Sequence, residues 1–119
     1  MYFDFKSENK LFDFLVAVYE GKIVGTAVFF YTYSTWKGKT LYLEDIVVNE
    51  QYRRTGIGSL LFDHLVEIAK GEKVKRMSWQ VLNWNNPAIE FYKKINANLD
   101  SEWINCKLSF EQIQSYPLK

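Results

Sequence analysis

The stretch that decides the fold is LYLEDIVVNEQYRRTGIGSLLFDHLVEIAK, residues 41–70. Its pattern predicts an apolar strand, a turn rich in arginine and glycine, and an amphipathic helix from about Gly58 to Lys70. The first N–H groups of a helix lack intrahelical partners, and the helix dipole makes that end positive. Glycines let a phosphate approach the backbone with no side chain in the way. The turn is therefore predicted to bind a pyrophosphate group.

Two adjacent carboxylates, Glu44 and Asp45, interrupt the apolar strand. Neighbours in a strand point to opposite faces, so at least one acid is expected on a protected face. Burying a carboxylate is unfavourable unless something compensates its charge, which favours a functional role for this pair. The alternative is that both are ordinary acids near a strand end that face solvent.

Composition limits the possible classes of protein. The 119 residues suit one domain, and 48% apolar with 18% aromatic residues suffice for a core. A formal net charge of +1 does not indicate nucleic-acid binding. The single cysteine, Cys106, excludes an internal disulfide and fits a reducing compartment. With neither a signal-peptide pattern nor an apolar run of about 20 residues, we expect a cytoplasmic protein without a membrane or nucleic-acid partner.

The remaining strands follow from alternation and turn residues. Residues 12–19 and 23–33 predict a hairpin about Glu20-Gly21-Lys22, and residues 40–48 predict a third antiparallel strand. After the helix, residues 76–82 predict a strand parallel to the third, reached by a right-handed crossover. Residues 103–108 predict a last strand.

Capping residues mark two further helices. Asn86 is the predicted N-cap of a short helix with Pro87 at its first position, and Asn96 is its predicted left-handed end. Ser109 and Gln112 predict a capping box for a terminal helix.

Three strings, in this order, carry a family resemblance: YTYSTWKGKTLYLEDIVV (residues 31–48), YRRTGIGSLL (52–61) and WNNPAIEFYKK (84–94). They resemble the GNAT superfamily of N-acetyltransferases and, within it, the diamine branch typified by spermidine/spermine N-acetyltransferase. Arg53, Gly56 and Gly58 match the fixed positions of that family's motif A. The resemblance implies an α+β fold over residues 1–119: a GNAT-like mixed, mostly antiparallel sheet with a crossover helix after the third strand.

The resemblance also implies an activity, the acetylation of a primary amine of a small molecule by acetyl-coenzyme A, without a metal. It makes Glu44 the base that accepts the amine proton and Tyr92 the acid that protonates the leaving thiolate. Helical spacing alone would make Tyr92 a core residue, and packing of its ring is compatible with that role. Trp36, Glu44 and Asp45 are implied to contact the substrate. Polyamines, thialysine-like amino acids and protein N-termini all remain open as acceptors.

A further set of residues is implied to bind the coenzyme. Backbone groups of the third strand would line the pantetheine arm, amides of the turn would hold the pyrophosphate, and two residues near the second helix would add contacts. In that order they are Ile46 and Val48; Arg53, Arg54, Thr55, Gly56, Ile57, Gly58 and Ser59; Asn85 and Lys93. Trp84 is expected to pack in the core.

The sequence departs from the family at three places, one of which is Asn96, where the family has a glycine after the second helix. Ser34 stands where the branch has an acidic residue that helps to hold substrate cations. Residues 1–11 are expected to be an irregular lead-in, so the fold is expected to be N-terminally shortened, without the family's first strand and two helices. The strand at residues 12–19 would then have an open apolar edge, which predicts self-association, and family members are commonly homodimers. The alternative function is a coenzyme-binding or assembly module without turnover.

Overall fold

The computed structural model describes residues 2–9 and 11–118, with side chains for residues 11–118. The chain divides into two compact units, Met1–Gln80 (unit 1) and Val81–Lys119 (unit 2). That these residues form one acetyltransferase-like domain stays a prediction.

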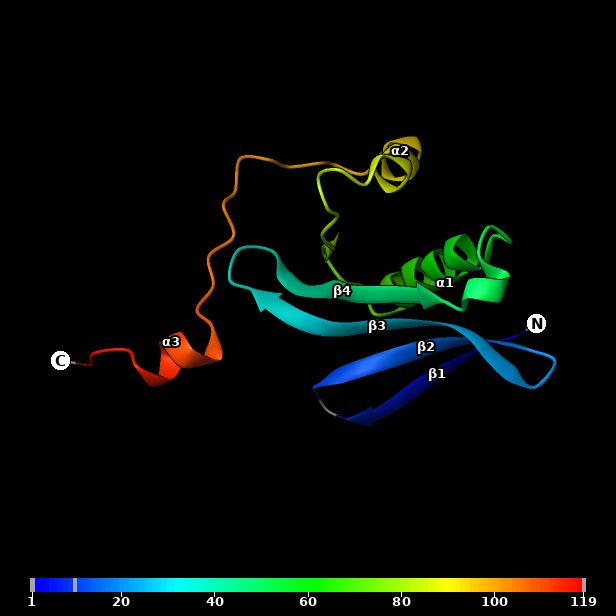
Figure 1. Ribbon diagram of the computed structural model, residues 1–119, viewed down its shortest axis with the longest axis horizontal. Coiled ribbons are helices and arrows are strands. Elements are labelled where there is room, and N and C mark those ends of the chain that lie inside the picture. Colours follow the sequence, from blue (N-terminus) through cyan, green and yellow to red (C-terminus); the bar gives the residue numbers. More distant parts are fainter. Residues whose placement is uncertain (1, 10, 119) are drawn as a thin grey trace. The chain divides into compact units, whose positions relative to one another are not determined.

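Unit 1 contains a five-stranded sheet whose strand order follows the chain (Figure 1). Its strands are β1 (Tyr2–Asn9), β2 (Phe12–Tyr19), β3 (Lys22–Ser34), β4 (Gly38–Val48) and β5 (Met77–Ser78). The first four pair antiparallel in succession, and β5 pairs parallel to β4 after the intervening helix α1 (Ile57–Gly71). The predicted mixed, mostly antiparallel sheet with its crossover helix is therefore confirmed.

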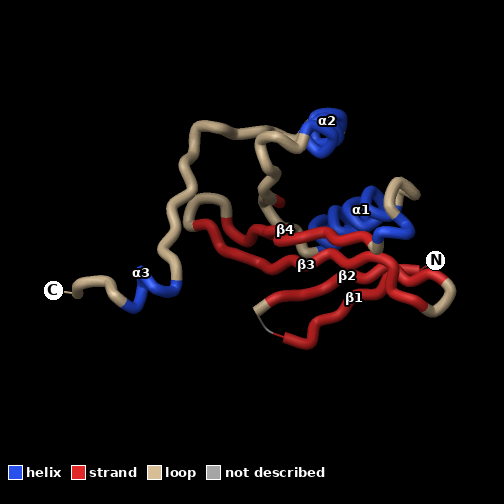
Figure 2. The backbone as a smooth tube through the Cα atoms, in the orientation of Figure 1, coloured by secondary structure: helices blue, strands red, loops and turns tan. Residues whose placement is uncertain are grey.

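The predicted irregular lead-in is wrong, because residues 2–9 form strand β1. β1 pairs with β2 from Tyr2 opposite Val18 to Lys6 opposite Phe14, and Figure 2 shows the two strands side by side. Because β1 contains several polar residues, its sequence shows no clear strand pattern. It forms a strand by pairing with β2, since strand formation depends strongly on cross-strand context. The edge strand on this side of the described sheet is consequently β1 and not, as expected, β2.

The β2–β3 connection is a two-residue hairpin turn. Glu20 and Gly21 both have left-handed backbone, with φ of 49° and 78°. Positive φ at both central residues is the pattern of a type I′ turn, whose twist matches that of the flanking strands. The predicted hairpin is confirmed.

Helix α1 packs on one face of the sheet and completes the core of unit 1. It extends one residue beyond the prediction at each end. Gly25 in β3 allows close approach, because a Cβ there would lie 3.0 Å from Leu61 Cδ1 and 3.1 Å from Ile57 Cγ2. The fully buried side chains of this core include Val24, Phe29, Thr40, Leu41, Ile57, Leu61 and Leu65.

Tyr31 in β3 belongs to a polar cluster at the margin of this core. Lys39 Nζ lies 4.4 Å from the centre of its ring and 2.7 Å from Glu72 Oε1. The pKa of Tyr31 is raised to about 12, chiefly by burial and further by the carboxylates of Glu72 and Asp13. The phenol therefore stays protonated throughout the physiological pH range.

Beyond α1 the structure is less regular than predicted. β5 is limited to Met77–Ser78, and the predicted strand at residues 103–108 is wrong, because that segment joins no ladder. Unit 2 contains helices α2 (Asn86–Lys94) and α3 (Phe110–Gln114), and the capping box of α3 is confirmed. None of the residues described in unit 2 is buried, so the expected core position of Trp84 is also wrong.

Candidate active site

The acidic pair lies at a β-bulge in β4. Leu43 faces Phe29 and Asp45 faces Val28 on β3, which leaves Glu44 as the extra residue. A bulge interrupts the alternation of a strand and re-aims its side chains. Glu44 and Asp45 are both exposed, so the expectation that one lies on a protected face is wrong. Glu44 nevertheless influences a neighbour, because its carboxylate adds to burial in raising the pKa of Tyr42.

The end of β4 has an open edge. β5 pairs with β4 only at Leu41 and Tyr42, so beyond Tyr42 no strand of the described sheet borders that edge. Ile46 and Val48 lie in this stretch, and their ladder partners are on β3. An extended ligand could therefore lie along β4 where a further strand would otherwise pair.

The turn between β4 and α1 is held by its own side chains. It contains the short 3₁₀ helix η1 (Glu50–Tyr52), capped by Asn49, whose side chain accepts a 3.1 Å hydrogen bond from Gln51 N. Asn49 N also donates to Val24 O at 2.8 Å, which fixes the turn to β3. Thr55 Oγ1 donates to the carbonyl of Tyr52. Sequence analysis missed Asn49, although an asparagine before a short helix is a common capping signal.

The two glycines of the turn, Gly56 and Gly58, differ in backbone conformation and in surroundings. Gly56 has a φ of 87° and is the N-cap of α1, and no heavy atom lies within 4 Å of where its Cβ would be. A Cβ on Gly58 would meet only Val48 Cγ2, at 3.8 Å. No side chain caps the first turn of α1, and that turn carries no acid. The start of α1 is therefore an open, positive helix end.

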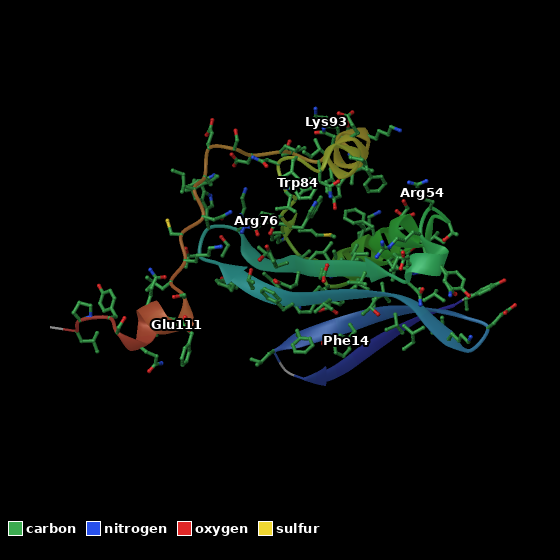
Figure 3. All side chains as sticks on the ribbon, in the orientation of Figure 1. Phe14, Arg54, Arg76, Trp84, Lys93 and Glu111 are labelled. Atoms are coloured by element: carbon green, nitrogen blue, oxygen red, sulfur yellow. The ribbon has the colours of Figure 1, made fainter. Side chains whose placement is uncertain are left out.

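Two basic residues give this turn positive charge. Arg53 and Arg54 are both exposed, and Figure 3 labels Arg54 at the turn before α1. Arg53 Nε donates to Val48 O at 3.4 Å, while Arg54 has left-handed backbone with a φ of 66°. Ile57 is buried and anchors the turn, whereas Ser59 is exposed. An anion fits this chemistry, because open backbone N–H groups, the helix dipole and guanidinium groups all favour negative charge.

Helix α2 of unit 2 carries the remaining predicted residues. Asn85, not Asn86, is its N-cap, with Oδ1 accepting from Ala88 N at 3.4 Å, and Pro87 is the second helical residue. The predicted cap was off by one because either asparagine could serve. Lys93, labelled in Figure 3, is exposed, and its Nζ lies 3.7 Å from Glu90 Oε1.

Tyr92 is partly buried on α2. Its ring meets that of Phe91 edge to face, with centroids 5.6 Å apart. Burial raises the pKa of Tyr92 above its usual value, so its hydroxyl carries a proton at neutral pH. The left-handed end of the helix is confirmed at Asn96, whose φ is 64°.

The predicted substrate residue Trp36 lies at the tip of the β3–β4 hairpin and is 90% exposed. Ser34 organises this tip, because its Oγ accepts hydrogen bonds from Trp36 N at 3.2 Å and Lys37 N at 3.0 Å. From Gly38 to Glu44 the strand advances roughly 20 Å at about 3.3 Å per residue. Trp36 and Glu44 are thus not brought together within unit 1.

Neither a metal cluster nor a membrane helix was found in residues 2–9 and 11–118. No group of three or more His, Cys, Asp or Glu that could hold a metal ion occurs there. No helix in these ranges has both the length and the apolarity to cross a bilayer.

Comparison with known proteins supports the fold and identifies relatives. A solved integron cassette protein from the V. cholerae mobile metagenome superposes with a TM-score of 0.80 at 28% identity, covering 91% of this chain and 67% of that one. The thialysine N-epsilon-acetyltransferase of Caenorhabditis elegans is 31% identical over 112 residues, which are 92% of this chain and 70% of that enzyme. The human spermidine/spermine N(1)-acetyltransferase-like protein 1 is 37% identical over 103 residues, 80% of this chain and 15% of that protein.

The relatives match the diamine branch, but many are longer. The chain spans 44% to 56% of the length of the mammalian thialysine N-epsilon-acetyltransferases that it matches. The model of the Acetyltransferase (GNAT) family matches residues 1–97. The chain therefore belongs to the GNAT acetyltransferase family.

Proposed function

We propose that this protein transfers an acetyl group from acetyl-coenzyme A to a primary amine of a small molecule, either a polyamine or an amino-acid-like amine. The observation that carries the proposal is the open start of α1, where Gly56 and Gly58 leave the backbone bare and no side chain caps the helix. The names of the relatives support the amine class, since they include acetyltransferases of thialysine and ornithine and a spermidine/spermine acetyltransferase-like protein.

Coenzyme binding is assigned to the turn and to the open edge of β4. Backbone N–H groups from Arg53 to Ser59 would hold the pyrophosphate, aided by the arginine side chains and the helix dipole. Ile46 and Val48 would pair with the amide groups of the pantetheine arm. Asn85 and Lys93 would add contacts from α2, although Asn85 Oδ1 is already engaged in capping.

Glu44 would prepare the amine for attack. A free amine has a pKa near 10 and is mostly protonated at neutral pH, so it must lose a proton before its lone pair can attack the thioester carbonyl. The carboxylate of Glu44 can accept that proton directly or through water, and its exposure gives an incoming amine access to it. Asp45 would add negative charge that attracts a cationic substrate.

Tyr92 would complete the transfer. As the new C–N bond forms and the C–S bond breaks, the leaving thiolate takes a proton, and the hydroxyl of Tyr92 can donate it. Burial raises the pKa of Tyr92, so its hydroxyl keeps that proton at neutral pH.

Substrate selection would depend on Trp36 only for a long substrate. The roughly 20 Å along β4 between the hairpin tip and Glu44 exceeds the reach of a small amino acid. Trp36 could therefore contact the far end of an extended polyamine, or a substrate bound by a second copy of the chain. We propose that the protein is a homodimer, and that it works in the cytoplasm, where a single exposed cysteine stays reduced.

A turnover assay tests the proposal. Thiol release is measured with acetyl-coenzyme A and a panel of spermidine, thialysine, ornithine and an unblocked peptide, beside calorimetric titration with coenzyme A. Tyr92→Phe should lower the rate by about 10²–10⁴-fold with little change in coenzyme affinity, and Glu44→Gln should lower it most at low pH, where neutral amine is scarce. Asp63→Asn, an exposed acid on α1, serves as the matched control for Glu44→Gln.

Each result has a definite meaning. Coenzyme binding without acetylation of any amine would favour the alternative, a binding module without turnover, for which Ser34 in place of an acid is the supporting feature. Absence of coenzyme binding would contradict the assignment of the α1 turn. Unchanged turnover in both variants would show that Glu44 and Tyr92 are misassigned.

A further inference from the structure

Two aromatic side chains lie near the proposed base Glu44, one on each of two neighbouring strands. Phe30 of β3 pairs with Tyr42 of β4, and their ring centroids are 5.3 Å apart with an angle of 37° between the ring planes. Both side chains are only half-buried. Tyr42 precedes Glu44 by two residues, so their backbones lie within roughly 7 Å of each other along the strand. A partly exposed aromatic surface, formed by Phe30 and Tyr42, therefore adjoins this carboxylate.

The aromatic surface lies on the sheet face opposite α1. Gly25 of β3 faces α1, since a Cβ there would meet Leu61 and Ile57. Side chains alternate along a strand, so Phe30, five residues after Gly25, points to the other face. Its ladder partner Tyr42 shares that face. The two rings are therefore not part of the core beneath α1.

The β-bulge in β4 gathers acidic groups beside these rings. Asp45 pairs with Val28, which is two residues from Phe30 on β3 and shares its face. Glu44 is the extra residue of the bulge. After burial, its carboxylate is the second cause that raises the pKa of Tyr42, so the two groups interact. In a regular strand one of two adjacent acids would point toward α1, whereas here both lie near the aromatic surface.

We propose that Phe30 and Tyr42 form the surface on which the amine substrate lies, with the ring of Tyr42 holding a cationic nitrogen while Glu44 receives the nitrogen that is acetylated. This inference rests on the proposed function and adds Tyr42 to it as a specificity-determining residue. The face of an aromatic ring attracts ammonium groups, and its apolar surface packs against an alkyl chain.

The charge of this sheet face favours a cation. Four ladder pairs of β3 and β4 share the face, and they contain neither lysine nor arginine: Thr26–Val47, Val28–Asp45, Phe30–Tyr42 and Thr32–Thr40. A second ammonium group on the substrate would meet an aromatic ring and two nearby carboxylates, and a substrate carboxylate at the same place would be repelled. The surface therefore favours a diamine over an amine that carries an acid.

A purely structural role is the alternative, because cross-strand aromatic pairs also stabilise sheets. The two roles differ in their effect on kinetics. A ring that holds the substrate equally well in the ground state and the transition state affects KM and leaves kcat unchanged. A ring that only supports the sheet would, on removal, displace Glu44 through the bulge and lower kcat.

The first test is calorimetric binding of tetramethylputrescine, a dication whose tertiary nitrogens cannot form a stable amide. It is titrated into the full chain with and without coenzyme A. Tyr42→Leu should raise its dissociation constant about three- to tenfold, as expected for loss of a cation–π contact at a partly exposed ring. Tyr42→Phe keeps the ring and should bind like the parent. Tyr33→Leu removes an exposed tyrosine on the α1 face of β3 and is the matched control.

The second test is steady-state acetylation of spermidine. Tyr42→Leu should raise KM by a similar factor and leave kcat within about twofold of the parental value. Phe30→Leu removes the neighbouring ring and should raise KM and the diamine dissociation constant by a smaller factor. Urea titration of each variant verifies that it remains folded, and Phe30→Leu decides by the same criteria if Tyr42→Leu is unfolded.

Failure of the parent chain to bind the diamine, or parental affinity in Tyr42→Leu, would overturn the proposal. So would equal weakening in Tyr42→Phe or in Tyr33→Leu, or a fall in kcat with unchanged KM. A chain that binds the diamine through Tyr42 but acetylates no amine would contradict the proposed function and leave the aromatic surface intact. Acetylation with parental KM in Tyr42→Leu would contradict the aromatic surface alone.

Discussion

Replacing Gly58 by alanine is expected to change stability and coenzyme affinity in opposite directions. Gly58 is not among the residues with positive φ, and a Cβ there would meet only Val48 Cγ2 at 3.8 Å, an ordinary contact. A glycine whose backbone suits alanine gains about 0.4–1 kcal/mol of stability from the substitution, because the unfolded chain loses freedom. The free energy of unfolding, measured in urea, should rise by that amount.

The added methyl group would stand where the pyrophosphate meets the first turn of α1. The dissociation constant of coenzyme A, measured by calorimetry, should rise at least tenfold, equivalent to about 1.4 kcal/mol. Gly71→Ala is the matched control at the other end of α1, since no atom lies within 4 Å of its Cβ position. It should leave coenzyme affinity unchanged. Parental affinity in Gly58→Ala, or equal weakening in both variants, would refute binding at this helix end.

Three further changes test other parts of unit 1. Ser34→Asp should preserve the structure of the hairpin tip, because a carboxylate can accept the same backbone hydrogen bonds. It should lower the KM for spermidine more than the KM for thialysine. KM values equal to those of the parent chain would exclude this tip from substrate binding. Gly25→Ala should lower the free energy of unfolding by about 1–3 kcal/mol, because its Cβ would lie 3.0 Å from Leu61, and unchanged urea stability would contradict that packing. The pKa of Tyr31 is about 10 in the unfolded chain and about 12 in the folded one, so the free energy of unfolding should fall as pH rises from 10 to 12. In urea titrations, Tyr31→Phe should reduce this loss of stability, and the control Tyr33→Phe should not.

Much of unit 1 could be predicted from local pattern. Alternation and aromatic content mark β2, β3 and β4, and Glu20-Gly21 marks their tight turn. The apolar face and the glycines fix the start of α1 within one residue. Each of these signals lies in the residues that form the element itself, so it can be recognised in one sequence without knowledge of the pairing partner.

The features that could not be predicted depend on how one segment of the chain pairs with another. The sequence predicts an irregular segment at residues 1–11 and a strand at residues 103–108, yet of the two only β1 has a neighbouring strand in the structure. The bulge that exposes both Glu44 and Asp45 is a register shift against β3, which no property of β4 alone specifies. Arg53–Ser59 form the predicted turn and helix start, while the coenzyme-binding role of these residues and the roles of Glu44, Tyr92 and Trp36 stay predictions.

Because strand order equals chain order, the strands β2, β3 and β4 each find their partner in the strand made just before them. Loops between such neighbours are short, so contacts are local in sequence and their closure costs little entropy. The β4–β5 pair is different, since it joins only after the whole of α1 has been formed. During synthesis from the N-terminus, each new strand of the meander therefore meets a template that is already available. The slowest step in forming the sheet should be the docking of α1 that brings β5 back beside β4.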